Sequence, residues 1–235
     1  MKIVSWNCNG KFREKFQLIE QANPDIWLIQ ECENPQSIPA SFKGYHSYCS
    51  NYLWVGDNKS KGIAVFAKKS IKIEQQACDT EFRGRKLKWF LSCLINEQTK
   101  ILCVWNHKNS CETFDYIGQF WLFMQKNREL LRGSIIAGDF NSNVIWDEWD
   151  RWWNHSDCVR ELDEIGLISI YHKFYAENQG KETLPTLFLQ RKFEKPYHID
   201  YLFAPKEMST GKLRVGKYSE WIKHSDHMPL EWEQD

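Results

Sequence analysis

Short apolar runs that each end in polar residues recur along the whole chain, and this pattern constrains the fold more than any other feature. Each run has the length of a β-strand, and turn residues separate it from the next one. Because a single flat sheet rarely holds this many strands, we expect two stacked sheets that helices cover. The predicted strands are 2–6, 25–30, 62–67, 71–75, 87–95, 101–105, 134–137, 186–189, 199–203, 213–215 and 229–232.

Apolar residues at helical spacing indicate a few helices between the strands. In the first of them Phe12, Phe16 and Ile19 fall on one face of the helix. The chain is therefore of the α/β class, and its length of 235 residues is compatible with one domain over residues 1–235. The predicted helices are 12–21, 113–127 and 157–165.

The charges cancel, because 31 Lys and Arg residues stand against 31 Asp and Glu residues. A neutral chain exerts no global attraction on nucleic acid or on an anionic membrane, so a polyanionic substrate would need a local basic patch or a bound cation. The hydrophobic fraction of 42% is ordinary for a globular protein and excludes a disordered chain.

No apolar run approaches the roughly 20 residues of a membrane span, and the N-terminal apolar stretch is too short for a signal peptide. We therefore expect a cytoplasmic monomer without a membrane partner. The eight cysteines form no CxxC pair, which argues against a structural zinc site. We expect all of them to be reduced, since the alternative of disulfides requires a secretory route.

Carboxylate, amide and imidazole side chains follow the predicted strands at their ends. Strand ends that converge at one edge build a site, and hard oxygen ligands together with histidines suit Mg²⁺ or Mn²⁺. Each residue alone has an ordinary structural explanation, such as an Asx turn at 138–141. The combination favours a functional site. Its members are Asn7, Glu31, Asn106, His107, Asp139, Asn141, Asp200, Asp226 and His227.

These motifs and their order resemble the endonuclease/exonuclease/phosphatase superfamily, which includes deoxyribonuclease I and exonuclease III. The resemblance implies a four-layer α/β sandwich of two stacked, mostly antiparallel β-sheets flanked by helices. It also implies cleavage of a phosphoester at the sheet edge with Mg²⁺, or Mn²⁺, as the cofactor. The matching segments are 5–10, 29–31, 61–66, 106–107, 138–141, 199–203 and 225–227.

The resemblance assigns the oxygen-bearing side chains to two roles. Glu31 looks like the principal metal ligand, with Asn7 and Asp226 beside it. Asp139 and Asn141 resemble the pair that positions and deprotonates the attacking water. A metal ion is expected in such a site because a phosphodiester repels anionic nucleophiles unless its charge is neutralised.

The two histidines resemble groups that act on the phosphate and on the leaving oxygen. His227 looks like the histidine that contacts the scissile phosphate, and Asp200 looks like the partner that orients it. A neighbouring carboxylate favours the charged imidazolium, which suits that contact. His107 matches the residue that stabilises or protonates the leaving oxygen, although Asn106 beside it is an alternative for that role and for substrate binding.

Basic and aromatic residues are the signals for the substrate. Arg83 and Arg85 match a region from which the family often extends an arginine to the substrate, so we expect them to bind it. A run of lysines within 59–72 either follows phosphates or protects a strand edge. The tryptophans at 146, 149, 152 and 153 either stack on bases or pack in the core, and the acidic residues between them favour the core.

The leading hypothesis is a phosphodiesterase that cleaves nucleic acid, with DNA as the substrate and an endonucleolytic mode. The first alternative is a phosphatase or phosphodiesterase that acts on a nucleotide, a lipid headgroup or another small phosphorylated molecule. An inactive binding module is a third hypothesis, and the filled catalytic positions argue against it. A nuclease predicts strong salt dependence, whereas a small-molecule phosphatase predicts a closed pocket.

Overall fold

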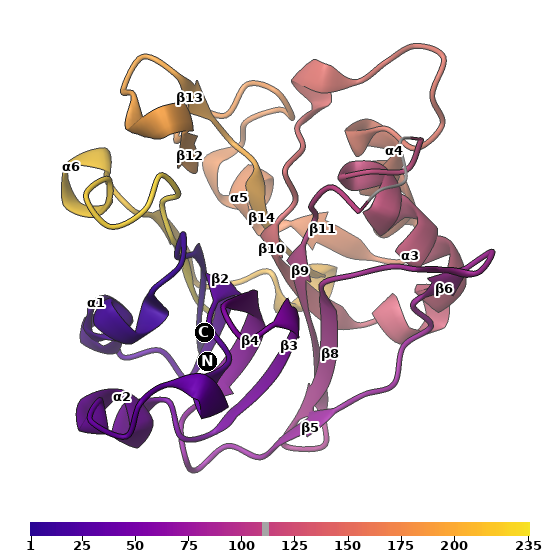
Figure 1. Ribbon diagram of the computed structural model, residues 1–235. Helices are drawn as coiled ribbons and strands as arrows, with labels where there is room; N and C mark the ends of the chain where they lie inside the picture. Colours follow the sequence, from indigo (N-terminus) through magenta and orange to yellow (C-terminus); the bar gives the residue numbers. More distant parts are fainter. Residues whose placement is uncertain (110–112) are drawn as a thin grey trace.

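The computed structural model describes residues 1–109 and 113–235 and contains two stacked six-stranded sheets (Figure 1). The first sheet consists of β1 (Lys2–Asn7), β2 (Ile26–Cys32), β3 (Tyr52–Asn58), β4 (Lys61–Ala67), β15 (Lys212–Val215) and β16 (Leu230–Glu233). The second consists of β5 (Ile73–Gln75), β8 (Phe90–Ile95), β9 (Thr99–Trp105), β10 (Ser134–Asp139), β11 (Leu167–Ser169) and β14 (Asp200–Pro205). Their orders are β15-β16-β1-β2-β4-β3 and β11-β14-β10-β9-β8-β5.

Helices and two small hairpins complete the fold. The hairpins are β6 (Glu81–Phe82) with β7 (Arg85–Lys86), and β12 (Leu187–Phe188) with β13 (Pro196–Tyr197). The α-helices are α1 (Phe16–Ala22), α2 (Lys43–Tyr48), α3 (Ile117–Leu131), α4 (His155–Glu164), α5 (Ile170–Tyr175) and α6 (Tyr218–Trp221). Short 3₁₀ turns are η1 (Phe12–Glu14), η2 (Pro35–Ser37), η3 (Val144–Trp146), η4 (Leu189–Arg191) and η5 (Lys206–Met208).

Three apolar layers hold the four structural layers together. Between the sheets, Leu28 of the first packs in one cluster with Ile135 and Leu202 of the second. Outside the first sheet, Phe16 of α1 and Tyr45 of α2 cover its other face. A third cluster places α3 and α4 on the outer face of the second sheet, and Figure 1 shows α1 and α2 on the side of the molecule opposite α3 and α4. The predicted sandwich is confirmed.

One parallel strand pair in each sheet sets the position of the site. β1 pairs parallel with β2, and β9 pairs parallel with β10, whereas the other strand pairs are antiparallel. The parallel strands of both sheets end at the same edge of the sandwich, because the side chains at the ends of β1 and β10 are hydrogen-bonded to each other. Asn7 ends β1, Asp139 ends β10 and Asn106 follows β9, so polar residues distant in the sequence meet there.

The structure contains a strand in each predicted strand region, with shifted ends, and adds β3, β6, β7, β11 and β13. The first predicted helix is broken at Lys15, whose φ of −124° ends the 3₁₀ turn η1 before α1 begins. The second begins only at Ile117, because Tyr116 has a positive φ of 55°. Helices α2, α5 and α6 had no helical pattern strong enough to predict them.

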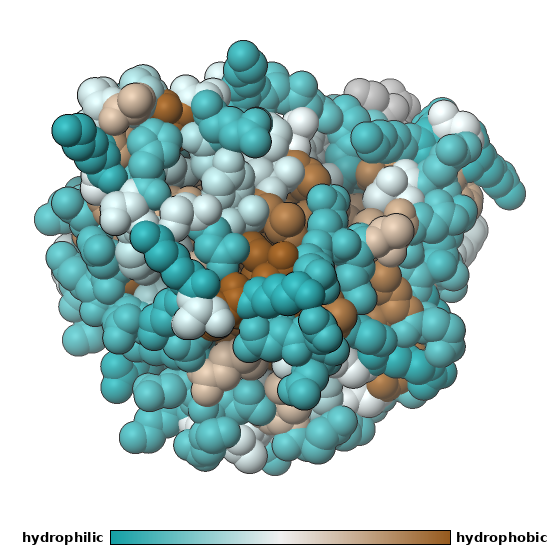
Figure 2. All heavy atoms as spheres, turned by 90° about the horizontal axis from the view of Figure 1, so that it is seen from below, coloured by the Kyte–Doolittle hydropathy of each residue, from teal (hydrophilic) through white to brown (hydrophobic). Residues whose placement is uncertain are grey.

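The end of the molecule opposite the strand ends is shown in Figure 2, where hydrophilic residues surround a narrow apolar band. Among the described residues, no helix is both long and apolar enough to cross a membrane. The cysteines that the structure describes are free thiols, and Cys111 lies outside the described residues. Those free thiols are Cys8, Cys32, Cys49, Cys78, Cys93, Cys103 and Cys158.

Candidate active site at the joined strand ends

Asp139, at the end of β10 in the second sheet, is hydrogen-bonded to the first sheet at the edge where the strands end. The Asn7 amide on the first sheet donates a hydrogen bond to Asp139 Oδ2 at 2.9 Å. Asn141 donates to the same oxygen through its side-chain amide at 3.0 Å and to Oδ1 through its backbone N–H at 2.9 Å. Asp139 is buried, so these amides replace the water that a carboxylate otherwise requires. The predicted Asp139–Asn141 pair is thus assembled with Asn7 as a third member.

A buried histidine–aspartate pair faces Asp139. His227 Nδ1 donates to Asp200 Oδ2 at 2.9 Å, and its Nε2 lies 3.9 Å from Asp139 Oδ2. Ser225 positions His227, since its hydroxyl accepts the backbone N–H of His227 at 3.0 Å. Thr186 similarly positions Asp200 by accepting its backbone N–H at 2.9 Å. The ring is therefore fixed with one nitrogen on Asp200 and the other directed toward Asp139.

Burial and neighbouring charges shift the pKa values of both His227 and Asp139. Burial alone lowers the pKa of His227, but the nearby carboxylates of Asp200 and Asp139 outweigh it and raise that pKa to about 10. Burial raises the pKa of Asp139, with Asp200 adding to the rise while His227 opposes it. The pair therefore consists of an imidazolium and a carboxylate that is more basic than a carboxylate in water.

Two groups of side chains are candidates for a metal site. Asp139, Asp200 and His227 offer ligand atoms that lie within 4.8 Å of one another. A protonated His227 is not a metal ligand, so this group fits a hydrogen-bonded dyad better than a cation site. The second group is Glu31 and Asp226 at the rim, whose carboxylates are the hard oxygen donors that Mg²⁺ prefers. The Asn7 carboxamide directs its nitrogen to Glu31 and its oxygen to the Asn9 backbone N–H, so it would have to rotate to join them as a ligand.

The rim carboxylates already bind a cation or a hydrogen-bond donor. Glu31 Oε2 lies 2.7 Å from the ammonium of Lys61, which acts as a stand-in cation. Its other oxygen accepts a hydrogen bond from the Asn7 amide at 3.2 Å. Asp226 accepts a hydrogen bond from the Asn9 amide at 2.8 Å. These donors fit a divalent cation at Glu31.

The remaining strand-end residues lie on the β9 side. His107 packs against Trp89, Trp105 and Tyr116, and its Nδ1 bonds to a backbone carbonyl at 3.1 Å. Asn106 is fully buried, and neither of its side-chain polar atoms has a partner among the described residues. Its backbone carbonyl accepts a hydrogen bond from Asn141 at 2.9 Å, so Asn106 contacts the site through its main chain.

The predicted basic residues lie apart from the dyad. Arg83 is in the turn of the β6–β7 hairpin, with its guanidinium over the Phe82 ring at 5.4 Å. Arg85 lines a separate cavity with Lys86 and Asn109. The structure leaves their substrate-binding role as a prediction.

The tryptophans after the Gly-Asp-Phe-Asn segment divide into two groups. Trp153 packs against Phe114, with ring centroids 4.8 Å apart. Trp149 is 95% exposed, and Trp146 and Trp152 are also exposed. The core-packing interpretation is therefore wrong for Trp146, Trp149 and Trp152, whose side chains lie on the surface.

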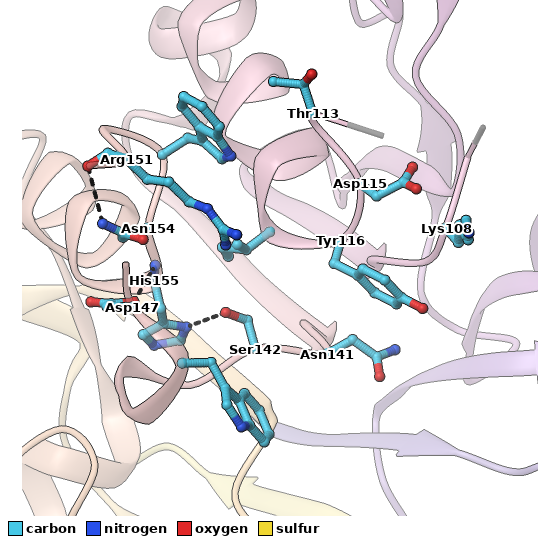
Figure 3. A pocket seen from close by; sticks show the side chains of 13 residues that line it. Lys108, Thr113, Asp115, Tyr116, Asn141, Ser142, Asp147, Arg151, Asn154 and His155 are labelled. Carbon is cyan, nitrogen blue, oxygen red and sulfur yellow. Dashed lines mark hydrogen bonds between the residues drawn. The ribbon is translucent and has the colours of Figure 1, made fainter. Parts of the chain in front are cut away.

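A cavity of about 720 Å³ opens beside Asn141. Figure 3 shows Arg151 reaching into this cavity from one side and Tyr116 from the other, with Asn141 below them. Lys108, Trp146 and Trp153 also line it. The sequence patterns singled out neither Tyr116 nor Arg151, because neither belongs to a strand end.

The chain resembles solved structures over its whole length. It is similar in fold to a 3′ phosphatase from Neisseria bound to a product DNA hairpin, with a TM-score of 0.68, 18% identity, and coverage of 100% of this chain and 99% of that chain. It is also similar in fold to an AP endonuclease from Archaeoglobus fulgidus, with a TM-score of 0.69, 17% identity, and coverage of 100% of this chain and 99% of that chain. For an AP endonuclease from Leishmania major the TM-score is 0.69 and the identity 14%, with coverage of 100% of this chain and 87% of that chain.

At these identities the solved structures establish the fold. The sequence matches none of the curated proteins with which it was compared. The model of the Endonuclease/Exonuclease/phosphatase family, however, matches residues 4–227. That range includes every strand-end residue described above, from Asn7 to His227. The chain therefore belongs to the Endonuclease/Exonuclease/phosphatase family.

Proposed function

We propose that this protein is a divalent-metal-dependent phosphodiesterase that cleaves nucleic acid, with DNA as its substrate and an endonucleolytic mode. The observation that carries the proposal is the buried contact between Asp139 and the His227–Asp200 pair at 3.9 Å. It joins a carboxylate of raised pKa to an imidazolium at one point. A phosphodiester hydrolase needs both a base for water and a cation for the phosphate.

Glu31, with Asn7 and Asp226, would hold Mg²⁺ or Mn²⁺ at the rim of the site. When bound, the ion would neutralise phosphate charge and polarise the bond to phosphorus. The Asn9 amide orients Asp226, and the Asn7 amide links Glu31 to Asp139, so one side chain connects the metal side and the base side.

Asp139 is the proposed general base. Burial raises the pKa of Asp139 toward neutral pH, so its carboxylate accepts a proton from water more readily than a carboxylate with an ordinary pKa. Asn141 and Asn7 each donate to Oδ2, so the carboxylate keeps one orientation. The water proton moves to Asp139 as the oxygen attacks phosphorus.

His227 is the proposed phosphate contact. The Asp200 carboxylate holds the ring through Nδ1 and favours its charged form. Nε2–H is then available to donate to a non-bridging phosphate oxygen, where negative charge increases in the transition state. His107 stays our proposal for the leaving-oxygen side, with its Nδ1 anchored to the carbonyl of Lys108.

The cavity beside Asn141 supports a nucleotide as the group next to the scissile bond. Its volume of about 720 Å³ lies in the range of ligand pockets. Tyr116 and Trp146 offer rings for a base, and Arg151 offers a planar cation for a phosphate or a base. Asp147 does not oppose an anion strongly, because its carboxylate accepts the backbone N–H groups of His155 and Ser156.

The test is incubation of the purified protein with supercoiled plasmid, single-stranded DNA, RNA, 3′-phosphorylated DNA and a small phosphodiester. Each is assayed with Mg²⁺, with Mn²⁺ and with EDTA, and Asp139→Asn is the control for a contaminating nuclease. Plasmid nicking that EDTA abolishes is expected. Turnover of the small phosphodiester or the 3′-phosphate alone would replace the proposal with a phosphatase, and no turnover would support a binding module.

A further inference from the structure

Lys61 occupies a specific place beside the rim carboxylate Glu31. The Lys61 ammonium lies 2.7 Å from Glu31 Oε2. In the pairing of β2 with β4, Gln30 faces Ile63 and Cys32 faces Gly62, so Glu31 is the extra residue of a bulge. A bulge redirects the side chain of the extra residue, and the positive φ of 60° at Glu31 shows the local distortion. Lys61, the first residue of β4, is next to that bulge.

A second contact holds the ammonium in place. Lys61 Nζ lies 5.4 Å from the centre of the Trp105 ring, whose side chain is buried at the end of β9. An ammonium over an indole face gains attraction from the ring quadrupole. Lys61 is thus placed between a carboxylate of the first sheet and an aromatic ring of the second. Both partners favour a cation at this point.

The other groups around Glu31 cannot replace Lys61 as a counter-charge. Asn7 and Asn9 are neutral amides, and they bind Glu31 and Asp226 without cancelling charge. His227 directs its two nitrogens to Asp200 and Asp139. Among the described ion pairs, the one that neutralises Glu31 is with Lys61.

We propose that Lys61 is a tethered counter-ion that competes with the divalent cation for Glu31 and is released when that cation binds. The proposal rests on the proposed function in one respect, the role of Glu31 as a metal ligand. The side chain of Lys61 is 48% exposed and its stem is flexible, so it can leave. A ligand that must first displace an internal competitor binds more weakly, in proportion to the fraction of free Glu31.

The released ammonium would be able to bind a phosphate oxygen of the substrate. Released Lys61 stays tethered to the start of β4 beside the bulge that carries Glu31, and an ammonium is a suitable point charge for a phosphate oxygen. A phosphodiester that holds Lys61 away from Glu31 would favour metal binding. By linkage, metal and substrate then strengthen the binding of each other by the same factor.

The experiment titrates Mn²⁺ alone into metal-free wild type and into Lys61→Met, with calorimetry and the Mn²⁺ resonance as readouts that need no turnover. Lys59→Met is the matched control, because Lys59 is exposed, lies two positions away and loses the same charge. We expect Lys61→Met to bind Mn²⁺ about five- to tenfold more tightly. Lys59→Met is expected to change the affinity less than twofold, and Lys61→Arg to resemble wild type.

A second readout is the melting temperature in EDTA. Loss of the counter-ion leaves Glu31 beside Asp226 and Asp139 without compensation, so Lys61→Met should melt lower than Lys59→Met, and Mn²⁺ should raise its melting temperature more. Equal or weaker Mn²⁺ affinity in Lys61→Met overturns the competition while leaving the proposed hydrolysis intact. A wild type that cleaves DNA without binding Mn²⁺ would overturn the metal role of Glu31 as well.

Discussion

At the scale of residues, Asp139 and His227 carry the proposed chemistry, and their removal gives the clearest prediction. We expect Asp139→Asn and His227→Ala each to lower the rate of DNA cleavage by about 10³-fold or more, because each removes a group that acts on a proton or on the developing charge. The measurement is plasmid nicking by purified variants with saturating Mg²⁺. Circular dichroism should show that both variants remain folded. Near-normal turnover in either variant would contradict its role.

His155 gives a prediction about stability. Burial lowers its pKa from the ordinary 6.5 to about 3. Between those values the unfolded chain binds a proton that the folded chain does not, so the stability is complete above pH 6.5 and decreases as the pH falls. We expect His155→Gln to reduce the loss of unfolding free energy between pH 7.5 and pH 5 by about 2 kcal/mol.

Urea denaturation of wild type and His155→Gln at both pH values measures this difference. His155 Nδ1 is hydrogen-bonded to the Ser142 hydroxyl at 3.3 Å, and glutamine can keep a polar group there. An equal pH dependence in the two proteins would show that other groups account for the acid sensitivity.

The positions of the polar strand ends are visible in the sequence for a physical reason. Polar side chains such as Glu31 and Asp139 interrupt apolar runs, and that interruption is visible without coordinates. Lys61 and Tyr116 have no such mark, since a lysine at the start of a strand and a tyrosine before a helix are common. Their positions depend on a bulge and on a cavity, and both arise only when separate segments pack together.

At the scale of elements, the β9–β10 pair depends on the absence of a side chain at Gly138. Its φ is 152°, and a Cβ there would lie 1.8 Å from the carbonyl oxygen of Val104. We expect Gly138→Ala to lower the unfolding free energy by about 3 kcal/mol or more, because backbone must move. Gly133→Ala is the matched control: its φ is also positive, at 71°, but the space around it is open.

Urea denaturation of the two glycine variants separates the clash from the strain. Gly133→Ala should cost about 1 kcal/mol, which is the cost of a positive φ alone. Equal losses in the two variants would show that the close approach of β9 and β10 is not what requires glycine.

The β6–β7 hairpin carries the prediction for substrate binding. We expect Arg83→Ala with Arg85→Ala to weaken DNA binding and to reduce the slope of log K against log salt by about 2, one for each phosphate contact. The rate at saturating DNA should be unchanged, because neither arginine contacts the dyad. Fluorescence anisotropy at several salt concentrations measures the slope.

The control for the hairpin is Lys43→Ala with Lys69→Ala, which removes the same charge from exposed positions in α2 and in the turn after β4. An equal loss of affinity in both double variants would indicate that net charge, and not the hairpin, controls binding.

The elements that the sequence did not predict lack a simple pattern. β3 is an edge strand that ends in Gly56, Asp57 and Asn58, and these residues resemble a turn more than a strand. Its pairing with β4 overrides that local preference. Likewise, no residue type marks Lys15 as the break between η1 and α1, because the break depends on the backbone conformation there.

At the scale of the whole molecule, the number of strands was sufficient to predict two sheets, but their pairing was not predictable. β16 pairs with β1 across nearly the whole chain length, β15 adds to the far side of β16, and no periodicity encodes that partner choice. Net neutrality also gave little information, since the local balance at Glu31 and Lys61 is what the site uses.

The hydrogen bond from Asn7 to Asp139 and the one from His227 to Asp200 both cross between the first sheet, or the segment that leads into it, and the second. Each sheet therefore contributes part of the candidate active site, and the site is assembled only while the two sheets are packed against each other. Catalytic competence is then a cooperative property of the fold. We expect activity and circular dichroism to be lost at the same urea midpoint, whereas activity lost first would reveal a separately opening centre. If the two midpoints coincide, the turnover rate measures the fraction of molecules in which the two sheets are packed together.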